Sequence, residues 1–205
     1  MMVVNPPKII GVGRNYGAHA RELGNETPTE PILFLKPRTA LLAPHQPIVL
    51  PKGAGRVEHE GEIGIVVGRT LRHATRAEAE AAIAGVVCCN DVTARTLQQQ
   101  DGQWTRAKGF DTFLPVGPRV VGGLDWRTLE VICRVNGEVR QHGHAHEMAF
   151  DIPFLLAFAS RVMTLEPGDL ILTGTPAGTS ELQAGDLVEV EIPGVGILTN
   201  PVQAE

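Results

Sequence analysis

Short apolar runs separated by glycine, proline and asparagine dominate the hydrophobic pattern of this 205-residue chain. Apolar runs of about four to eight residues between turn residues are typical of strands. Asn136-Gly137 lies between two such runs and predicts a tight hairpin. The pattern as a whole predicts an acidic strand at 58–67, an edge strand within 44–51, and further strands at 8–12, 32–35, 85–90, 129–135, 138–142, 170–173 and 187–192.

Two segments carry clear helix signals. Thr75 and Glu78 form a capping box and Gly85 supplies a stop, which predicts a helix over 75–84. Asp151 caps a second helix over 151–163, with Pro153 in its first turn. Shorter helical turns are expected at 18–23 and at 92–100, the latter with Asn90 or Asp91 near its start. We therefore predict a single domain over 1–205, of the β-rich α+β class, with two clear helices and no linker.

Residues 13–31 form a long, mostly polar segment with little regular structure apart from the short helical turn. Long irregular segments inside compact domains are typically lids or binding loops. This segment is therefore predicted to be an active-site lid.

Charge and composition exclude several classes of protein. The net charge of −5 and the lack of a basic run argue against a nucleic-acid partner. No apolar run approaches about 20 residues, so no membrane span is expected. The start lacks the apolar stretch of a signal peptide, and the three cysteines, Cys88, Cys89 and Cys133, lie in apolar runs as reduced thiols do. We expect a cytoplasmic protein.

Carboxylates alternate in the first half of the predicted acidic strand. Glu58, Glu60 and Glu62 would share one face, where three like charges repel unless a cation lies between them. Carboxylate oxygens suit a hard divalent ion such as Mg²⁺, Mn²⁺ or Ca²⁺. Asp91 follows the apolar run 86–89 and could complete such a site. The alternatives are a solvated acidic edge strand, and a helix cap in the case of Asp91.

Two further features could supply catalytic groups. Lys108 has small and apolar neighbours, so its ammonium could point inward and neutralise an enolate or a carboxylate. His19 and Glu22 share a face at helical spacing, and a histidine held by a glutamate is a general base of fixed orientation. A surface lysine and a surface contact are the respective alternatives.

Seven short motifs occur in a fixed order between residues 8 and 192. With them the chain resembles the fumarylacetoacetate hydrolase family, in its single-domain acylpyruvase, oxaloacetate decarboxylase and isomerase branch. The motifs are VGRNY at 12–16, FLKP at 34–37, HEGE at 59–62, NDVTAR at 90–95, AKGF at 107–110, VNGE at 135–138 and LTGTPAG at 172–178.

The resemblance implies a mixed β-sandwich roll with short flanking helices, assembled as a homodimer. It also implies one Mg²⁺ or Mn²⁺ per chain, held by Glu60, Glu62 and Asp91, with Ca²⁺ as a non-physiological occupant. Glu58 is then a bystander or a group that supports the ligands from outside.

The same resemblance assigns the remaining site residues. His19 and Glu22 correspond to a lid dyad that activates water or moves a proton, and Lys108 to the cation that steadies developing charge. The positions where relatives contact substrate are Arg14, Tyr16, Gln98 and Thr175.

The chain departs from the family pattern in three places. The loop 96–105 is short, which bears on the substrate contact assigned to Gln98. Thr179-Ser180-Glu181 replaces the usual turn after Gly178, which could shift Thr175. The hairpin end reads Gly-His-Ala-His-Glu at 143–147, so that His142, His144 and His146 alternate. Alternating histidines are typical of a soft-metal site, although an exposed hairpin end is the preferred interpretation.

The family likeness implies metal-dependent hydrolysis of a C–C bond in a small acylpyruvate or β-diketo acid, through a stabilised enolate. The presence of both His19 and Glu22 favours hydrolysis. The alternatives are a decarboxylase, or an isomerase or tautomerase of 2-oxo or 2-hydroxy-diene dioates, because one enolate supports all three reactions. A non-catalytic, metal-stabilised or ligand-sensing scaffold would explain the carboxylates but not the lysine and the dyad.

Overall fold

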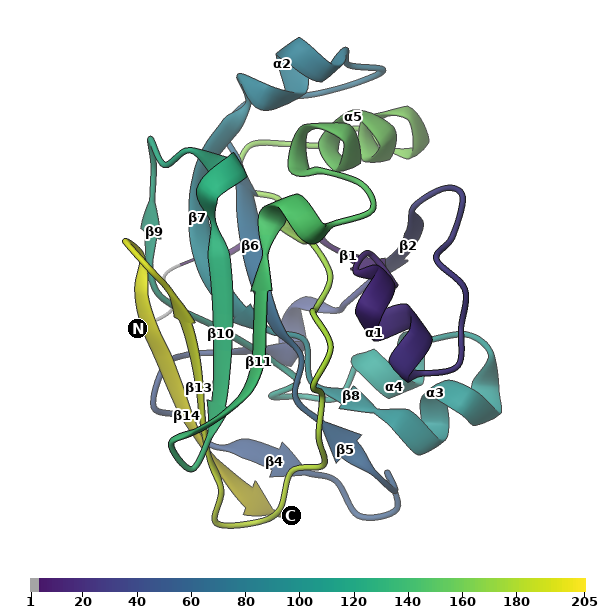
Figure 1. Ribbon diagram of the computed structural model, residues 1–205, viewed down its shortest axis with the longest axis vertical. Coiled ribbons are helices and arrows are strands. Elements are labelled where there is room, and N and C mark those ends of the chain that lie inside the picture. Colours follow the sequence, from purple (N-terminus) through teal and green to yellow (C-terminus); the bar gives the residue numbers. More distant parts are fainter. Residues whose placement is uncertain (1–3) are drawn as a thin grey trace.

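Two packed sheets form the body of the protein (Figure 1). The computed structural model describes residues 4–205. The larger sheet is mixed and contains, in spatial order, β2 (Ile32–Leu35), β1 (Ile9–Gly13), β12 (Leu170–Leu172), β6 (Gly61–Val67), β7 (Ile83–Asn90), β9 (Leu114–Val121) and β3 (Leu41–Leu42). The smaller sheet contains β11 (Glu138–His144), β10 (Glu130–Val135), β13 (Leu187–Ile192), β14 (Gly196–Ala204) and β4 (Ile48–Leu50). A separate short pair joins β5 (Val57–Glu58) to β8 (Thr93–Ala94).

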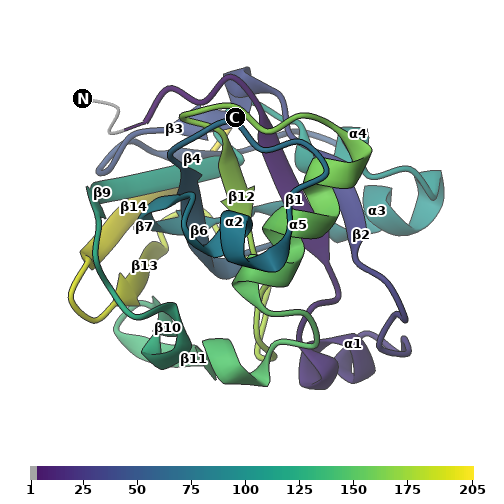
Figure 2. The same cartoon turned by 90° about the horizontal axis from the view of Figure 1, so that it is seen from above.

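Short helices surround the sheets, as the β-rich fold class predicted. Figure 1 shows α2 and α5 together at one end of the sheets, and both views place α1, α3 and α4 on the side of β2 (Figure 2). The helices are α1 (Gly17–Glu22), α2 (Arg76–Glu80), α3 (Arg95–Asp101), α4 (Thr105–Lys108) and α5 (Ile152–Val162). No helix within residues 4–205 has the length and apolarity needed to cross a bilayer.

The larger apolar cluster lies between the sheets, and a smaller one, which includes Val87 and Cys89 of β7, lies on the other face of the larger sheet. Ile63, Ile65 and Val67 of β6 are buried on the side opposite Glu62, as the alternation of the acidic strand predicted. From the smaller sheet, Val131 and Cys133 of β10 face the same core. The core therefore fixes β6 with its carboxylate on the other face.

Several predicted elements are confirmed. The Asn136-Gly137 hairpin joins β10 to β11 with Val135 opposite Glu138. The capping box of Thr75 and Glu78 is present at the start of α2. Asp151 accepts the Phe154 N–H at the start of α5, with a proline in the first turn.

The predicted continuous strand at 58–67 is wrong. His59 and Glu60 belong to neither β5 nor β6, because side chains take the backbone N–H groups at this point. The Asn90 Oδ1 atom accepts from Glu60 N at 2.9 Å, and the Gln141 Oε1 atom accepts from Gly61 N at 2.9 Å. The chain changes partner here, from β8 to β7 and β12.

The helix boundaries also need correction. α2 ends at Glu80 rather than 84, because Ile83 already pairs with Val67 of β6, and Gly85 lies inside β7. The 92–100 turn is α3, which starts at Arg95 and has no side-chain cap, so Asp91 is not a helix cap. The count of two clear helices is too low, because the structure has five α-helices within 4–205.

Two long strands, β9 and β14, were not predicted from the sequence. Pro115 and Pro118 interrupt the first and Pro201 the second. Proline lacks the N–H that a ladder uses, so its presence argues against a strand when only the sequence is read. Here the pairing with β3, β7, β13 and β4 outweighs that local signal.

Candidate active site

Three buried carboxylates meet at the ends of two central strands of the larger sheet. β6 and β7 are antiparallel with Gly61 opposite Asn90, so the start of β6 lies beside the end of β7. This pairing brings together Glu60, Glu62 and Asp91, and one oxygen from each lies within 4.8 Å of the others. We call these three residues the acidic cluster. The prediction that Asp91 joins the Glu60/Glu62 pair, although distant in sequence, agrees with this geometry.

Three buried cations surround the acidic cluster. Lys108 Nζ lies 2.7 Å from Glu60 Oε2 and 2.5 Å from Asp91 Oδ2. Lys36 Nζ lies 2.6 Å from Asp91 Oδ1. Arg95 NH1 lies 2.6 Å from Glu60 Oε1. The inward orientation predicted for Lys108 is therefore observed.

Lys36 and Arg95 were not singled out from the sequence. Both lie inside motifs that carry the family resemblance, FLKP and NDVTAR, but the sequence assigned no role to either charged side chain. A lysine at the end of a short apolar strand, directly before proline, was the available signal for Lys36.

Glu58 lies outside the acidic cluster, as the bystander assignment predicted. Arg95 Nε donates to Glu58 Oε2 at 2.7 Å, and Arg56 NH2 lies 2.5 Å from Glu58 Oε1. These guanidinium groups outweigh burial and lower the pKa of Glu58 below its usual range. Because Arg95 bonds both Glu58 and Glu60, Glu58 fixes the orientation of a guanidinium that faces the cluster.

The carboxylates of the acidic cluster differ in electrostatic balance. Burial, together with the Asp91 and Glu60 charges, raises the pKa of Glu62 well above its ordinary value. Burial also opposes ionisation of Glu60, but Lys108 and Arg95 lower its pKa below the usual range. Within 4–205, Glu62 forms no ion pair and accepts a hydrogen bond from Gly174 N at 2.8 Å.

These residues fit a hard divalent cation. The donors are three carboxylates with no nitrogen or sulfur, which is the ligand chemistry of Mg²⁺ and Mn²⁺. Glu62 is buried and has no lysine or arginine partner within residues 4–205, and this is the observation that calls for added positive charge when it ionises. The chain itself offers three ligands, which leaves other positions of an octahedral ion for water or substrate.

The predicted dyad lies on α1. His19 Nδ1 is 3.1 Å from Glu22 Oε2, and the imidazole is 4% exposed. The Glu22 carboxylate also accepts from Gly178 N, at 3.0 Å and 3.2 Å for its two oxygens. α1 is thus tied to the loop that follows β12.

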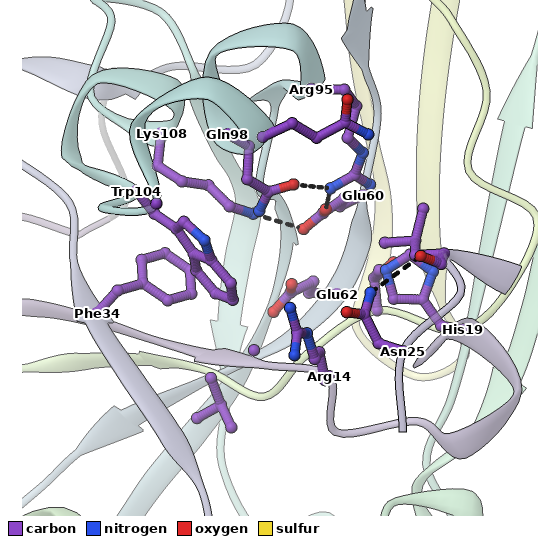
Figure 3. Close-up of a pocket in the computed structure, with 16 residues that line it drawn as sticks. Arg14, His19, Asn25, Phe34, Glu60, Glu62, Arg95, Gln98, Trp104 and Lys108 are labelled. Carbon is purple, nitrogen blue, oxygen red and sulfur yellow. Dashed lines mark hydrogen bonds and ion pairs between the residues drawn. The ribbon is translucent and has the colours of Figure 1, made fainter. Parts of the chain in front are cut away.

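His19 of the dyad and Glu60 and Glu62 of the acidic cluster line one cavity of about 350 Å³, whereas Glu22 and Asp91 are not among its lining residues. Figure 3 shows Lys108 and an aromatic pair on one side, His19 and Asn25 on the other, and Glu60 and Glu62 between them. The aromatic pair, Phe34 and Trp104, meets edge to face with ring centroids 5.3 Å apart, and the Lys108 ammonium lies 5.0 Å from the Phe34 centroid. Neither aromatic residue was predicted from the sequence.

Three of the four predicted substrate contacts line the cavity. Arg14 and Gln98 line the cavity, and Gln98 Oε1 accepts from Arg95 NH1 at 3.0 Å. Thr175 also lines it, but its hydroxyl donates to Gly61 O at 2.9 Å and accepts from Gln141 Nε2 at 2.7 Å. Thr175 therefore lies at the cavity wall in spite of the altered turn after Gly178.

Tyr16, the fourth predicted substrate contact, is not among the residues that line the cavity. Its side chain is buried beside Gly143, and its backbone pairs with Met148. Burial and the nearby Glu62 and Glu147 raise the pKa of its phenol. A contact between Tyr16 and substrate stays a prediction.

Gln141 connects the smaller sheet to the site. It is 1% exposed, and its Oε1 atom contacts His59 Nδ1 at 3.0 Å and Gly61 N at 2.9 Å. Its Nε2 atom donates to Thr175 Oγ1 and Pro176 O, both at 2.7 Å. One side chain thus fixes the backbone between Glu60 and Glu62.

Comparisons with known proteins agree with this site. An uncharacterised protein of Methanocaldococcus jannaschii is 50% identical over 202 residues, covering 98% of this chain and 85% of the relative. A mitochondrial oxaloacetate tautomerase of Homo sapiens is 38% identical over 212 residues, covering 98% of this chain and 68% of the relative. The human relative is mitochondrial, so the cytoplasmic location stays a prediction.

A solved structure and a family model point the same way. The crystal structure of 5-carboxymethyl-2-hydroxymuconate delta-isomerase from Mycobacterium smegmatis matches with a TM-score of 0.92 and 48% identity, covering 98% of this chain and 80% of the other. The family described as fumarylacetoacetate (FAA) hydrolase C-terminal matches residues 8–203. The chain is therefore an enzyme of the fumarylacetoacetate hydrolase family.

Proposed function

We propose that this enzyme moves a proton on the enolate of a small 2-oxo dicarboxylate, as an isomerase or tautomerase. The observation that carries this proposal is the shared cavity: the His19 imidazole lines the same space as Glu60, Glu62 and Lys108. Two of the relatives described above are named as a tautomerase and a delta-isomerase, and both reactions move a proton. The proposal replaces C–C hydrolysis as the leading activity.

The acidic cluster would hold one Mg²⁺ or Mn²⁺. A bound ion of this kind supplies Lewis acidity, which polarises a 2-oxo group and favours its enolate. Arg14, Arg95 and Lys108 line the cavity and present positive charge to the carboxylates of the substrate.

His19 is the proposed proton carrier. Its Nδ1 atom is engaged with Glu22, which leaves Nε2 as the nitrogen that exchanges a proton with the substrate. The Glu22 carboxylate holds the imidazole in one tautomer and orientation. The same carboxylate bonds Gly178 N and so holds α1 over the cavity, where the helix would exclude water.

Hydrolysis of an acylpyruvate is the second candidate. The observation that favours it is the same dyad, because an oriented imidazole also activates water. Decarboxylation forms an enolate that can take its proton from solvent after CO₂ leaves, so it is an outcome of the assay rather than a third proposal.

One assay separates these reactions. The purified enzyme, supplied with Mg²⁺ or Mn²⁺, is incubated with oxaloacetate, a 2-hydroxy-diene dioate and acetylpyruvate, and the products are followed by NMR in D₂O. We expect deuterium at the carbon beside the 2-oxo group, faster than carbon loss or chain cleavage. Rapid cleavage of acetylpyruvate without deuterium exchange into either dicarboxylate would contradict the proposal and support hydrolysis.

A further inference from the structure

A second group of metal-ligating side chains lies on the β10–β11 hairpin, outside the active site. β11 is the edge strand of the smaller sheet, and Glu130 lies opposite His144 while Ile132 lies opposite His142. His142 and His144 are two residues apart and share the outward face of the strand. One ligand atom each from Glu130, His142 and His144 lies within 4.8 Å of the others.

We propose that Glu130, His142 and His144 bind a borderline transition-metal ion of the Zn²⁺ type. The alternating histidines are visible in the sequence, but the carboxylate of Glu130 is not, because it precedes His142 by 12 residues and reaches it only through the hairpin register. Two imidazoles and one carboxylate are a donor set that zinc uses, with water in the fourth position.

The spacing of the ligand atoms suits a tetrahedral ion. Zinc bonds of about 2.0–2.2 Å place neighbouring ligand atoms roughly 3.4 Å apart. Glu130 Oε2 lies 2.7 Å from His142 Nε2 and 3.8 Å from His144 Nδ1, so the observed separations bracket that value. The third separation, between the two imidazole nitrogens, lies within 4.8 Å.

Neighbouring groups restrict the motion of these side chains. The His144 ring stacks on His146 with centroids 5.1 Å apart and an interplanar angle of 19°. The Glu147 carboxylate accepts from the backbone N–H of His144 at 2.7 Å. The hairpin end is therefore held before any ion arrives, which lowers the entropy cost of binding.

The hairpin site and the acidic cluster would select different ions. The acidic cluster offers only oxygen, which suits hard ions, whereas the hairpin offers two imidazole nitrogens, which favour Zn²⁺, Ni²⁺ or Cu²⁺. Saturating Mg²⁺ should therefore occupy the acidic cluster and leave the hairpin free for zinc.

Zinc titration of the whole chain in saturating Mg²⁺, followed by calorimetry, tests the proposal. We expect one site with a dissociation constant of about 10 μM or tighter. His142→Ala and His144→Ala should each weaken binding by roughly tenfold or more, and Glu130→Gln should weaken it less. His45→Asn is the matched control, because His45 is exposed and has a left-handed backbone that asparagine tolerates.

Two further measurements locate the ion and its ligands. The Glu60→Gln variant, which disables the acidic cluster, should keep the zinc site. Co²⁺ bound to that variant should give the intense visible bands of a tetrahedral complex. Unchanged zinc affinity in the His142→Ala/His144→Ala double variant, millimolar affinity in the wild type, or loss of binding only in Glu60→Gln would each overturn the proposal.

Discussion

Glu62 differs from the other carboxylates of the acidic cluster because no lysine or arginine pairs with it within residues 4–205. In the unfolded chain Glu62 loses its proton at the ordinary pKa of a carboxyl group, whereas in the folded, metal-free chain the raised pKa keeps the proton bound to higher pH. The folding stability of the metal-free chain should therefore fall as pH rises from the ordinary pKa towards the raised one.

Binding of Mg²⁺ should release this proton, since the ion requires an ionised carboxylate. Calorimetry in two buffers of different ionisation enthalpy measures the release, and the affinity for Mg²⁺ should increase with pH. Identical heats in both buffers would show that Glu62 is already ionised. In Glu62→Gln the proton release and the Mg²⁺-induced rise in Tm should both disappear.

Glu60 has the opposite balance, because Lys108 and Arg95 both bond it. Glu60→Gln leaves these buried cations partly unpaired, and we expect a loss of about 3–5 kcal/mol in the free energy of unfolding. Mg²⁺ binding and turnover should be lost as well.

Glu58→Gln is the matched control for Glu60→Gln. Glu58 is equally buried and bonded to Arg95, but it lies outside the acidic cluster. It should lower stability while Mg²⁺ still binds. Equal loss of Mg²⁺ affinity in both variants would contradict the ligand assignment.

His19 is proposed to move the proton. His19→Asn should reduce kcat for tautomerisation by roughly 10²–10⁴-fold, the usual contribution of a positioned general base. Mg²⁺ affinity measured by calorimetry should not change, because His19 is no ligand. A variant with wild-type kcat would contradict the role of the dyad.

The helix α1 depends on one carboxylate for its position, since Glu22 joins His19 to Gly178. Glu22→Gln retains an oxygen that can accept from Gly178 N but removes the negative charge beside the imidazole. We expect a lower kcat with little change in KM for Glu22→Gln, whereas Glu22→Ala should also raise KM because α1 loses its anchor.

Glu26→Gln is the control for the Glu22 variants. Glu26 is exposed in the same predicted lid and should leave both constants unchanged. If Glu22→Gln and Glu22→Ala behave alike, the anchor on Gly178 contributes nothing.

The sequence predicts those elements whose signals are local. The hairpin at Asn136-Gly137 and the caps at Thr75 and Asp151 depend on neighbouring residues, and all three are found. The break at His59–Glu60 depends on Asn90 and Gln141, which are 30 and 80 residues away from the N–H groups they bind. Such a contact cannot be read from local pattern.

The same division holds within the site. Alternating carboxylates and the spacing of His19 and Glu22 pointed to the acidic cluster and the dyad. Lys36 and Arg95 enter only because the end of β2 and the start of α3 converge on Asp91 and Glu60. Tyr16 was placed by resemblance, and the burial of its ring beside Gly143 removes it from the cavity wall.

The fold as a whole should survive removal of the ion. Its apolar core lies between the two sheets, on the side of β6 opposite Glu62, and Lys108 already bridges Glu60 and Asp91. A chelator should abolish turnover while the far-ultraviolet circular dichroism is retained and Tm falls only modestly. Unfolding on chelation would instead favour a structural ion.

The homodimer implied by the family resemblance remains a prediction. Size-exclusion chromatography with light scattering should give twice the 22.0 kDa mass of the chain. A single-chain mass at micromolar concentration would contradict it.

Gln141 is the residue of β11 whose side chain reaches the active site. Its amide bonds His59, Gly61, Thr175 and Pro176, while His142 directly after it faces outward. A change at Gln141 would disturb the catalytic pocket, whereas the exposed Asn136-Gly137 turn lies at the other end of the hairpin, away from both the pocket and the proposed zinc ligands. An engineer seeking to attach a reporter to this enzyme should begin at that turn.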